Sequence, residues 1–342
     1  MMTTMTTTSR RLAHRLARGS RRVLASVPLI ALAALLPFVA ARAAADNADV
    51  VCPPAALPLT MDRLQNGMRD AKDHGFLWRI SKDGRSSYLY GTIHAARPEW
   101  MFPGPTVQDA VRSSDVMALE LDVLDPDIQR RLVEHIGPQR DDPLPDALVR
   151  RIDRQLAVEC VDALAFSKFA PEFQIASLTV IAARRDGFDP AYAIDLVLAI
   201  LAHQLAKPVV SLETPESQMQ ALQMPTQAET IEFVTSGLDD LESGRARPLL
   251  NHIAKAWTDS DYAELARYEQ WCDCTRTAAE RAATKRLLDD RNPALAAGID
   301  ALHASGKQIF AAVGALHMIG PNGLPALMRQ RGYKVEQGDF GR

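Results

Sequence analysis

Two histidines follow a glycine at the same spacing near opposite ends of the chain. Tyr88–His94 reads YLYGTIH and contains Gly91, and Ile309–His317 reads IFAAVGALH and contains Gly314. Each Gly-x-x-His ends a short apolar run that is typical of a buried strand. Ligands of open α/β sheets bind beyond the carboxyl ends of such strands. One motif of this kind is weak evidence, but two of them predict a shared site that contains both imidazoles.

Acidic residues take similar positions in two other apolar runs. Asp115–Val123 (DVMALELDV) contains Glu120 and Asp122, and Val209–Glu213 ends at a glutamate. Side chains two residues apart in a strand point to the same face, so Glu120 and Asp122 are expected side by side. A buried carboxylate needs a partner, and the structural explanation for Glu120 is a core arginine. Capping of the next helix is the corresponding explanation for Glu213.

These residue types could bind a metal ion and move protons. The carboxyl edge of the sheet would present His94, His317, Glu120 and Glu213, with Asp122 as a further candidate. Two imidazoles and a carboxylate are a common ligand set for a divalent ion. Such an ion lowers the pKa of its water towards about 7. A second carboxylate would then serve as general base and later as proton donor. Without a metal, a His–Glu pair could still activate water.

Other motifs of hydrolases and nucleotide-binding proteins do not occur. The sequence has no Gly-x-Ser-x-Gly elbow, no His-Glu-x-x-His and no phosphate-binding glycine loop. We therefore do not expect a serine hydrolase, a helical zinc protease of the usual kind or a P-loop enzyme.

Residues 1–43 have the pattern of a secretory signal. Arginines precede the apolar run 23–40, and Ala41-Arg42-Ala43 forms a cleavage site, so we expect export to the periplasm or beyond and no stable membrane span after cleavage. An uncleaved anchor is the alternative, because the run approaches the roughly 20 apolar residues that a span needs. The leader holds seven arginines and no acidic residue, which leaves 32 basic and 42 acidic residues and a net charge of −10. Such a surface repels nucleic acid and anionic lipid.

Four cysteines are present, at Cys52, Cys160, Cys272 and Cys274. An even number in an exported protein indicates two disulfides, for which three pairings exist. A ring between Cys272 and Cys274 would be very small, so each is expected to pair with Cys52 or Cys160. A metal site is the alternative for the last two, although zinc sites usually have two residues between the cysteines.

The remaining patterns predict an α/β fold with a mixed sheet and a large helical portion. Residues 44–70 are expected to be irregular, and 76–81 and 87–94 to form a hairpin. Strand, helix and strand over 309–336 form a βαβ unit, so part of the sheet should be parallel. His135, His203, His252 and His303 lie in helical segments and are expected to be surface or packing residues. The expected helices are 107–113, 126–135, 143–156, 161–166, 171–185, 193–206, 215–222, 227–241, 247–257, 259–271, 275–304 and one ending near 331.

Several short motifs together resemble a known family. They are LWRI (77–80), YLYGTIH (88–94), LELD (119–122), LET (212–214), Arg291-Asn292, VGALH (313–317) and GYKV (332–335). This order is similar to that of the TraB/PrgY/GumN family, which includes the Tiki metalloproteases.

The resemblance implies a fold akin to erythromycin-esterase and ChaN-like proteins, over residues 71–338 with a helical insertion around 215–305. It implies a site of His94, His317 and Glu120 with a divalent ion (manganese, cobalt or zinc). Arg291 then joins Glu120 and Glu213 as a candidate catalytic residue. Gly91, Gly314, Asp122 and Asp195 are candidate supporting residues. Asp195 lies near a helix start, where capping or a dipole contact would also explain it, and it follows Ala193 where relatives tend to have glycine.

Two functions are consistent with these features. The first is an exported, metal-dependent hydrolase that acts on a peptide or another amide. The second is a non-catalytic periplasmic protein that binds peptide or glycan fragments, for example as an accessory to exopolysaccharide production. A metal-free, esterase-like hydrolase is a further alternative.

Overall fold

A six-stranded sheet forms the centre of the computed structural model, which describes residues 51–57, 60–138, 142–275, 277–338 and 340. The proposed secretory signal lies outside these residues. The strand order is β4-β3-β5-β2-β1-β6. The strands are β1 Phe76–Lys82, β2 Arg85–Thr92, β3 Val116–Leu119, β4 Val209–Ser211, β5 Ile309–Gly314 and β6 Lys334–Gln337.

The sheet is mixed, as predicted. β1 and β2 form the expected antiparallel hairpin, and β1 is also antiparallel to β6. β2 and β3 both pair with β5 in parallel, and β3 pairs with β4 in parallel. The carboxyl ends of β2, β3, β4 and β5 therefore meet at one edge. In the β2–β5 register Thr92 lies opposite Gly314, which brings the two Gly-x-x-His motifs to neighbouring strand ends.

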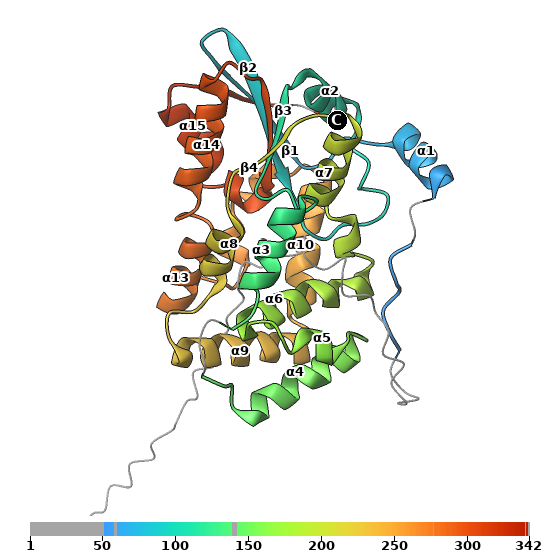
Figure 1. The fold of residues 1–342 in the computed structure, drawn as a ribbon, viewed down its shortest axis with the longest axis vertical. Coiled ribbons are helices and arrows are strands. Elements are labelled where there is room, and N and C mark those ends of the chain that lie inside the picture. Colours follow the sequence, from blue (N-terminus) through green and yellow to red (C-terminus); the bar gives the residue numbers. More distant parts are fainter. Residues whose placement is uncertain (1–50, 58–59, 139–141, 276, 339, 341–342) are drawn as a thin grey trace, which may run out of the picture.

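Helices cover both faces of the sheet and extend beyond the edge at which β2, β3, β4 and β5 end (Figure 1). α14 and α15 lie on one side, and α2 and α7 on the other. The helices are α1 Met61–Asp70, α2 Pro105–Ser113, α3 Pro126–His135, α4 Asp146–Val158, α5 Ala163–Phe166, α6 Pro171–Ala182, α7 Ile194–Gln204, α8 Pro215–Leu222, α9 Gln227–Glu242, α10 Ala246–Thr258, α11 Tyr262–Leu265, α12 Tyr268–Trp271, α13 Ala278–Leu287, α14 Asn292–Ala304 and α15 Leu324–Gln330, with 3₁₀ turns η2 Ala183–Asp186, η3 Pro190–Tyr192 and η4 Ala315–Met318.

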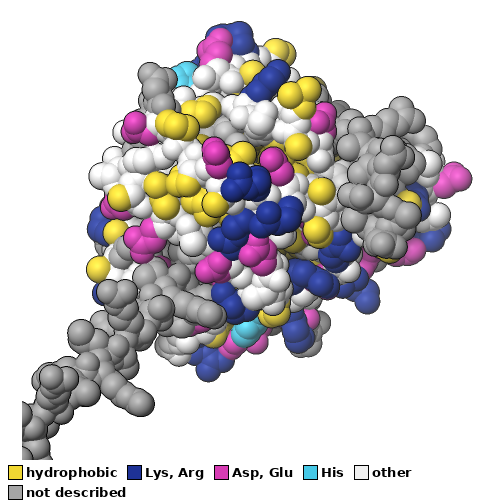
Figure 2. Space-filling model, turned by 90° about the horizontal axis from the view of Figure 1, so that it is seen from below, with side chains coloured by type: hydrophobic (Ala, Val, Ile, Leu, Met, Phe, Trp, Pro, Cys, Tyr) yellow, Lys and Arg dark blue, Asp and Glu magenta, His cyan; other side chains and the backbone are white. Residues whose placement is uncertain are grey.

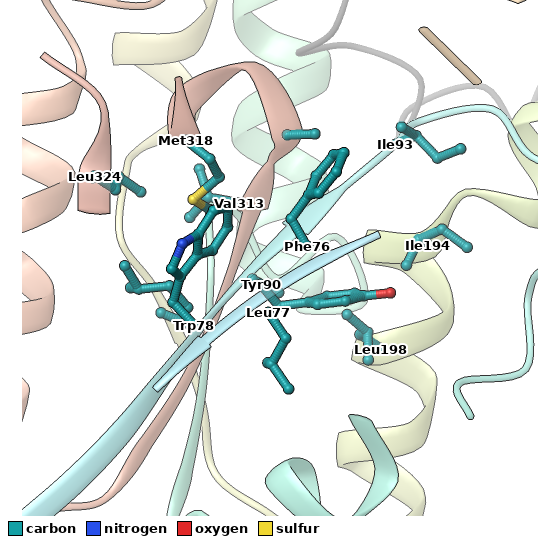
Figure 3. Packing of buried hydrophobic residues seen from close by; sticks show 14 of the residues in the cluster. Phe76, Leu77, Trp78, Tyr90, Ile93, Ile194, Leu198, Val313, Met318 and Leu324 are labelled. Atoms are coloured by element: carbon teal, nitrogen blue, oxygen red, sulfur yellow. The ribbon is translucent and has the colours of Figure 1, made fainter. Parts of the chain in front are cut away.

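The main core lies on the sheet. Alternation along a strand sends successive side chains to opposite faces. In Figure 3 the Tyr90 ring extends towards Leu198 of α7, whereas Trp78 extends towards Met318 and Leu324. All five side chains are buried. The elements on the two faces are therefore packed against the hairpin of β1 and β2.

A second core joins the helices beyond the strand ends. Its buried residues come mainly from α3, α4, α6, α8 and α9, and they include Leu132, Leu156, Leu178 and Val234. We call this part, α3 to α6 together with α8, α9 and α13, the helical lobe (Figure 1). Both the segment between β3 and β4 and the segment between β4 and β5 contribute to it.

Side-chain caps and prolines fix the start of the helices nearest the strand ends. Asp125 accepts hydrogen bonds from the first backbone N–H groups of α3, with Pro126 as the first helical residue. Thr214 and Ser217 form a capping box at the start of α8, again with a proline first. The helix over 126–135 has the predicted bounds.

Several segments differ from the prediction. Residues 61–70 form helix α1, within the segment expected to be irregular, and Thr60 caps it. The helix expected over 259–271 is two short helices, α11 and α12, and the helix expected over 275–304 is α13 and α14. The strand predicted over 115–123 is shorter, because β3 ends at Leu119 and stops before Glu120 and Asp122.

The disulfide pairing expected from ring size is wrong. Cys52 bonds to Cys160, and Cys272 bonds to Cys274 across a sequence separation of two. Asp273, between the last two, has a φ of 57°, in the left-handed region. That conformation turns the chain sharply enough to bring the two Cα atoms to 5.1 Å, a normal disulfide separation.

Candidate functional site

The ends of four parallel strands supply the charged and imidazole groups of one site. His94 follows β2, Glu120 follows β3, Glu213 follows β4, and His317 lies in η4 directly after β5. Arg291 joins them from the turn between α13 and α14. The structure thus brings the four predicted acids and histidines to one edge of the sheet, beside the helical lobe.

Arg291 links the two glutamates. Its Nε donates to Glu213 Oε1 at 2.8 Å, and its Nη2 donates to Glu213 Oε2 at 2.5 Å and to Glu120 Oε2 at 2.6 Å. Gln218 of α8 donates from Nε2 to both carboxylates, at 3.1 Å for Glu120 and 3.0 Å for Glu213. The Gly314 N–H donates to Glu120 Oε1 at 2.8 Å. Pairing with a core arginine, the structural alternative for Glu120, is therefore what the structure shows.

The network keeps its members charged although they are buried. Burial would raise the pKa of Glu120, but Arg291, His94 and the Gly314 N–H outweigh it and lower that pKa below its ordinary value. Burial would lower the pKa of Arg291, but Glu120 and Glu213 raise it. Glu120 is therefore an ionised carboxylate at neutral pH.

His94 is held by a carboxylate and presents a free nitrogen. Its Nδ1 lies 3.0 Å from Asp195 Oδ1 in the first turn of α7. Because the carboxylate accepts, Nδ1 is the protonated nitrogen. Nε2 is buried and has no hydrogen-bond partner among the residues that the structure describes. Burial would lower the pKa of His94, but Asp195 and then Glu120 outweigh it and raise that pKa above its ordinary value.

His317 is oriented by an amide instead of a carboxylate. Its Nδ1 lies 2.7 Å from Asn292 Oδ1, and Asn292 Nδ2 donates to the Asn322 carbonyl at 2.9 Å. The second hydrogen bond fixes which end of the amide faces the ring, so Nδ1 of His317 donates and Nε2 keeps its lone pair. Burial and the nearby Arg291 lower the pKa of His317 well below its ordinary value. This ring is neutral.

The site contains more acidic than basic side chains. His94 lies near enough to Glu120, Arg291 and His317 to interact with each of them electrostatically. Three carboxylates, those of Glu120, Glu213 and Asp195, share the site with one guanidinium, that of Arg291. Buried negative charge of this kind is stabilised by a proton, for example on His94, or by a cation.

Each of the two histidines is oriented as a metal ligand usually is, and both oxygens of Glu120 have hydrogen-bond partners. Each ring is held through Nδ1 by an oxygen acceptor, as is usual for metal-ligating histidines, and His94 Nε2 is an unpaired buried donor atom. The oxygens of Glu120 already accept from Gly314, Arg291 and Gln218. Across the described residues, no group of three or more His, Cys, Asp or Glu side chains is placed to hold a metal ion.

Gly91, the glycine of the first Gly-x-x-His motif, allows two backbone segments to approach closely. A Cβ on Gly91 would lie 3.2 Å from Ala315 Cα and 3.3 Å from its Cβ, both in η4. The Gly91 carbonyl accepts from Trp257 Nε1 at 2.7 Å. The glycine of one motif thus packs against the turn that carries the histidine of the other.

Asp122 does not join the site. Because β3 ends at Leu119, the alternation that would align Asp122 with Glu120 does not continue, and Asp122 Oδ2 lies 2.8 Å from His203 Nε2. Its Oδ1 accepts from the Leu124 N–H. Asp122 thus pairs with a histidine of α7 and shapes the turn before α3.

The other helical histidines have structural partners. His303 is buried between Ser87 and the Lys82 carbonyl, and His252 stacks on Trp271 and pairs with Glu264.

Gln218 and Asn292 are the two site residues that the sequence analysis missed as participants. Each lies near a motif that was recognised, five residues after Glu213 and directly after Arg291. Amide side chains are common on helices, so residue type gave no signal. The available signal was position: Gln218 follows the acid at the end of a strand, and Asn292 is the first residue of a helix.

Comparisons with known proteins agree with this arrangement of motifs. A model of the TraB/PrgY/gumN family matches residues 76–337. The chain is 24% identical over 319 residues to a protein of Danio rerio named Metalloprotease TIKI1, covering 79% of this chain and 64% of that protein. It is 25% identical over 321 residues to Metalloprotease TIKI1 of Homo sapiens, covering 79% and 63%. No solved structure gives a significant match.

The chain spans less than two thirds of the length of these relatives. The name of these two relatives describes a protease that uses a metal, and their identity to this chain is low. In the part of the chain that the structure describes, no helix is both long and apolar enough to cross a bilayer.

Proposed function

Because this chain belongs to the TraB/PrgY/GumN family, we propose that it is an exported hydrolase that cleaves peptide or other amide bonds. The observation that carries the proposal is His94, a buried imidazole with Nδ1 held by Asp195 and an unpartnered Nε2. A buried polar atom without a partner costs free energy, so it is retained where it meets a ligand or a reacting group. The relatives named metalloproteases support the reaction class.

We further propose that Nε2 of His94 and Nε2 of His317 hold a divalent ion, with manganese, cobalt or zinc as candidates. The neutral state of His317, whose Nδ1 is held by Asn292, supports this proposal because its Nε2 keeps a lone pair for a cation. Such an ion, when bound, activates water and polarises a carbonyl.

The remaining residues position the histidines and manage protons. Asp195 and Asn292 fix the ring orientations through Nδ1. Arg291 keeps Glu120 ionised, and Oε1 of Glu120 accepts one hydrogen bond, from Gly314, so a second lone pair is available to take a proton from water. Glu213 accepts from Nε and Nη2 of the guanidinium and so orients the Nη2 that also donates to Glu120.

Export and domain extent are part of the same proposal. The two disulfides suit an oxidising compartment such as the periplasm, and the leader pattern of residues 1–43 supports that route. We propose a single functional unit over residues 71–338, within which the family match 76–337 lies.

Metal content and turnover test the proposal together. Purified protein is analysed for bound metals and assayed on a peptide library, alongside His94→Ala and His317→Ala. The matched control is His135→Ala, which removes a partly exposed imidazole at the end of α3 that lies beside Glu216. We expect loss of metal and of at least about 10²-fold in rate for the two site variants only. Unchanged turnover in both would contradict the proposal.

A metal-free hydrolase is the second candidate, because the Asp195–His94 pair also resembles a general base. The raised pKa of His94 makes its Nε2 a stronger proton acceptor than an ordinary imidazole. Turnover that survives chelation but is lost in His94→Ala would favour this candidate. Saturable binding of peptide or glycan fragments without product would favour a binding protein.

A further inference from the structure

A small apolar recess lies on one side of His94. It has a volume of about 40 Å³. It is formed where the loop after β2 meets the end of α6, η2 and the middle of α10. Its lining consists of Ile93, His94, Ala95, Val180, Ala183, Phe188, Leu250, Ile253 and Ala254.

Apart from His94, the lining is made of hydrocarbon side chains. Ala183, Phe188 and Ala254 form a separate buried cluster, against which Ala95 and Leu250 pack. The two buried alanines leave the space that larger side chains would fill. A recess of this composition binds apolar groups and does not hold water well.

The surroundings of His94 are therefore divided. The Glu120–Arg291–Glu213 network interacts with the ring electrostatically, while the recess offers only apolar contact. Ligand pockets commonly combine apolar walls with a few charged groups that fix orientation. A substrate at His94 can thus place a polar, reacting group near the charged network and an apolar group in the recess.

We propose that the recess is a specificity pocket that takes an aliphatic side chain of the substrate, next to the bond that is cleaved. This inference rests on the proposed hydrolase function. About 10–15 Å³ of such volume holds one water, so the recess holds roughly three water-sized groups. That size matches valine or leucine and excludes an aromatic ring.

Variants that fill or enlarge the recess test the proposal without touching the site residues. Ala254→Leu fills the recess, and Leu250→Ala enlarges it from a half-buried position. Both are assayed on peptides that differ in a single residue, glycine, leucine or phenylalanine. We expect Ala254→Leu to lower kcat/KM for the leucine peptide by about tenfold or more, with the glycine peptide changed less than about twofold. Leu250→Ala is expected to shift preference towards phenylalanine.

Ala183→Val keeps the test valid if Ala254→Leu fails to fold, since it fills the same recess by two methyl groups. A structural effect alone would lower kcat/KM for all three peptides by the same factor. An equal loss of kcat/KM on all three peptides, or higher thermal stability with an unchanged order of preference among them, would overturn the proposal and identify the recess as a packing void.

A binding readout separates this inference from the proposed reaction. Isovaleramide, with a branched aliphatic group, and acetamide are titrated against the metal-free protein while the imidazole NMR signals of His94 are followed. We expect saturable shifts with isovaleramide, weaker ones with acetamide, and their loss in Ala254→Leu. That result with no turnover of any peptide would contradict the hydrolase proposal alone. Equal responses to both amides would contradict the specificity pocket.

Discussion

The charge state of His94 depends most strongly on the carboxylate of Asp195. Replacing Asp195 by asparagine removes the larger of the two carboxylate interactions that oppose the effect of burial, so the pKa of His94 is expected to fall. NMR titration of the metal-free protein measures this pKa in both forms. Asp122→Asn is the matched control, because that carboxylate pairs with His203. A His94 pKa that is the same in Asp195→Asn as in the parent protein would show that Asp195 does not set it.

The same pair predicts the direction of a pH effect on stability. A raised pKa in the folded state contributes stability that is fully present below the unfolded pKa, about 6.5, and is lost as pH rises through the folded pKa. Asp195→Asn should therefore lower the free energy of unfolding more at about pH 5.5 than at about pH 9. Urea unfolding at the two pH values measures the difference. A larger deficit at high pH would reverse the assigned sign.

Arg291 is a buried cation on which two buried carboxylates depend. Its side chain is 7% exposed, and Arg291→Met would leave Glu120 and Glu213 without a counter-charge. Removal of one partner from a buried ion pair costs about 3–5 kcal/mol. Arg291→Lys should recover only part of this, because an ammonium cannot reproduce the fork of donors. Urea unfolding measures both, with Arg79→Met on the exposed side of β1 as control.

The strand ends were predictable and the partners across the site were not. The apolar runs that end in Gly91-x-x-His94 or at Glu120 could be recognised as strands, because the pattern of a strand depends only on residues close together in the sequence. Pairing of Asp195 with His94, or of Asn292 with His317, joins residues whose proximity depends on how helices dock. Resemblance to a family supplied Asp195 and Arg291 as candidates.

Two errors at element scale have a common cause. Asp122 was aligned with Glu120 by assuming that the strand continues, and ring size was used to exclude the bond between Cys272 and Cys274. The position of Asp122 and the bond between Cys272 and Cys274 both depend on backbone dihedral angles just after a strand or helix ends. The end of β3 at Leu119 decides the first, and the left-handed conformation of Asp273 decides the second. Residue type indicates neither of these backbone conformations.

The Gly-x-x-His motif makes a prediction about elements as well as residues. In Gly91→Ala the new methyl group would meet η4 at 3.2–3.3 Å, so η4 must move by a few tenths of an ångström, and His317 with it. We expect a loss of about 1–3 kcal/mol in the free energy of unfolding, typical of overpacking, and weaker metal binding. Gly137→Ala is the control, because its Cβ would lie 3.4 Å from the nearest atom, the Lys168 carbonyl oxygen. Equal stability of the two variants would show that the close approach is not needed.

At the scale of the whole molecule, the site lies between a sheet and a helical lobe with separate cores. Gln218 of α8 reaches the two glutamates from the lobe side, so the lobe completes the charged network. Seen from below, the exposed end of the lobe carries basic side chains with acidic ones beside them (Figure 2). Arg151 of α4, for example, pairs with Asp239 and Glu242 of α9. Mixed charge of this kind gives the lobe surface no strong attraction for nucleic acid.

The long-range disulfide ties the N-terminal segment to the helical lobe. Cys52 and Cys160 are separated by 108 residues. Nearby, the Leu57 N–H donates to the Tyr192 hydroxyl and Arg185 donates to the Val51 carbonyl. In the chain-entropy description, closing a loop of this length removes about 4.7 kcal/mol of unfolded-state freedom, whereas a three-residue ring removes roughly a third of that. We therefore expect Cys52→Ser/Cys160→Ser to lower the free energy of unfolding by more than Cys272→Ser/Cys274→Ser, by about 2 kcal/mol or more.

Chemical unfolding of the oxidised parent and the two double variants measures this difference. Refolding of each protein at constant pH, without reductant, shows that the transitions are reversible and can be compared. The chemical change is the same in both variants, because each exchanges two sulfur atoms for two hydroxyl groups. Since Cys272 and Cys274 are the more deeply buried pair, side-chain burial alone predicts the opposite order. A larger loss in Cys272→Ser/Cys274→Ser would therefore show that local packing at that turn, and not restriction of the unfolded chain, dominates the contribution of the disulfides to stability.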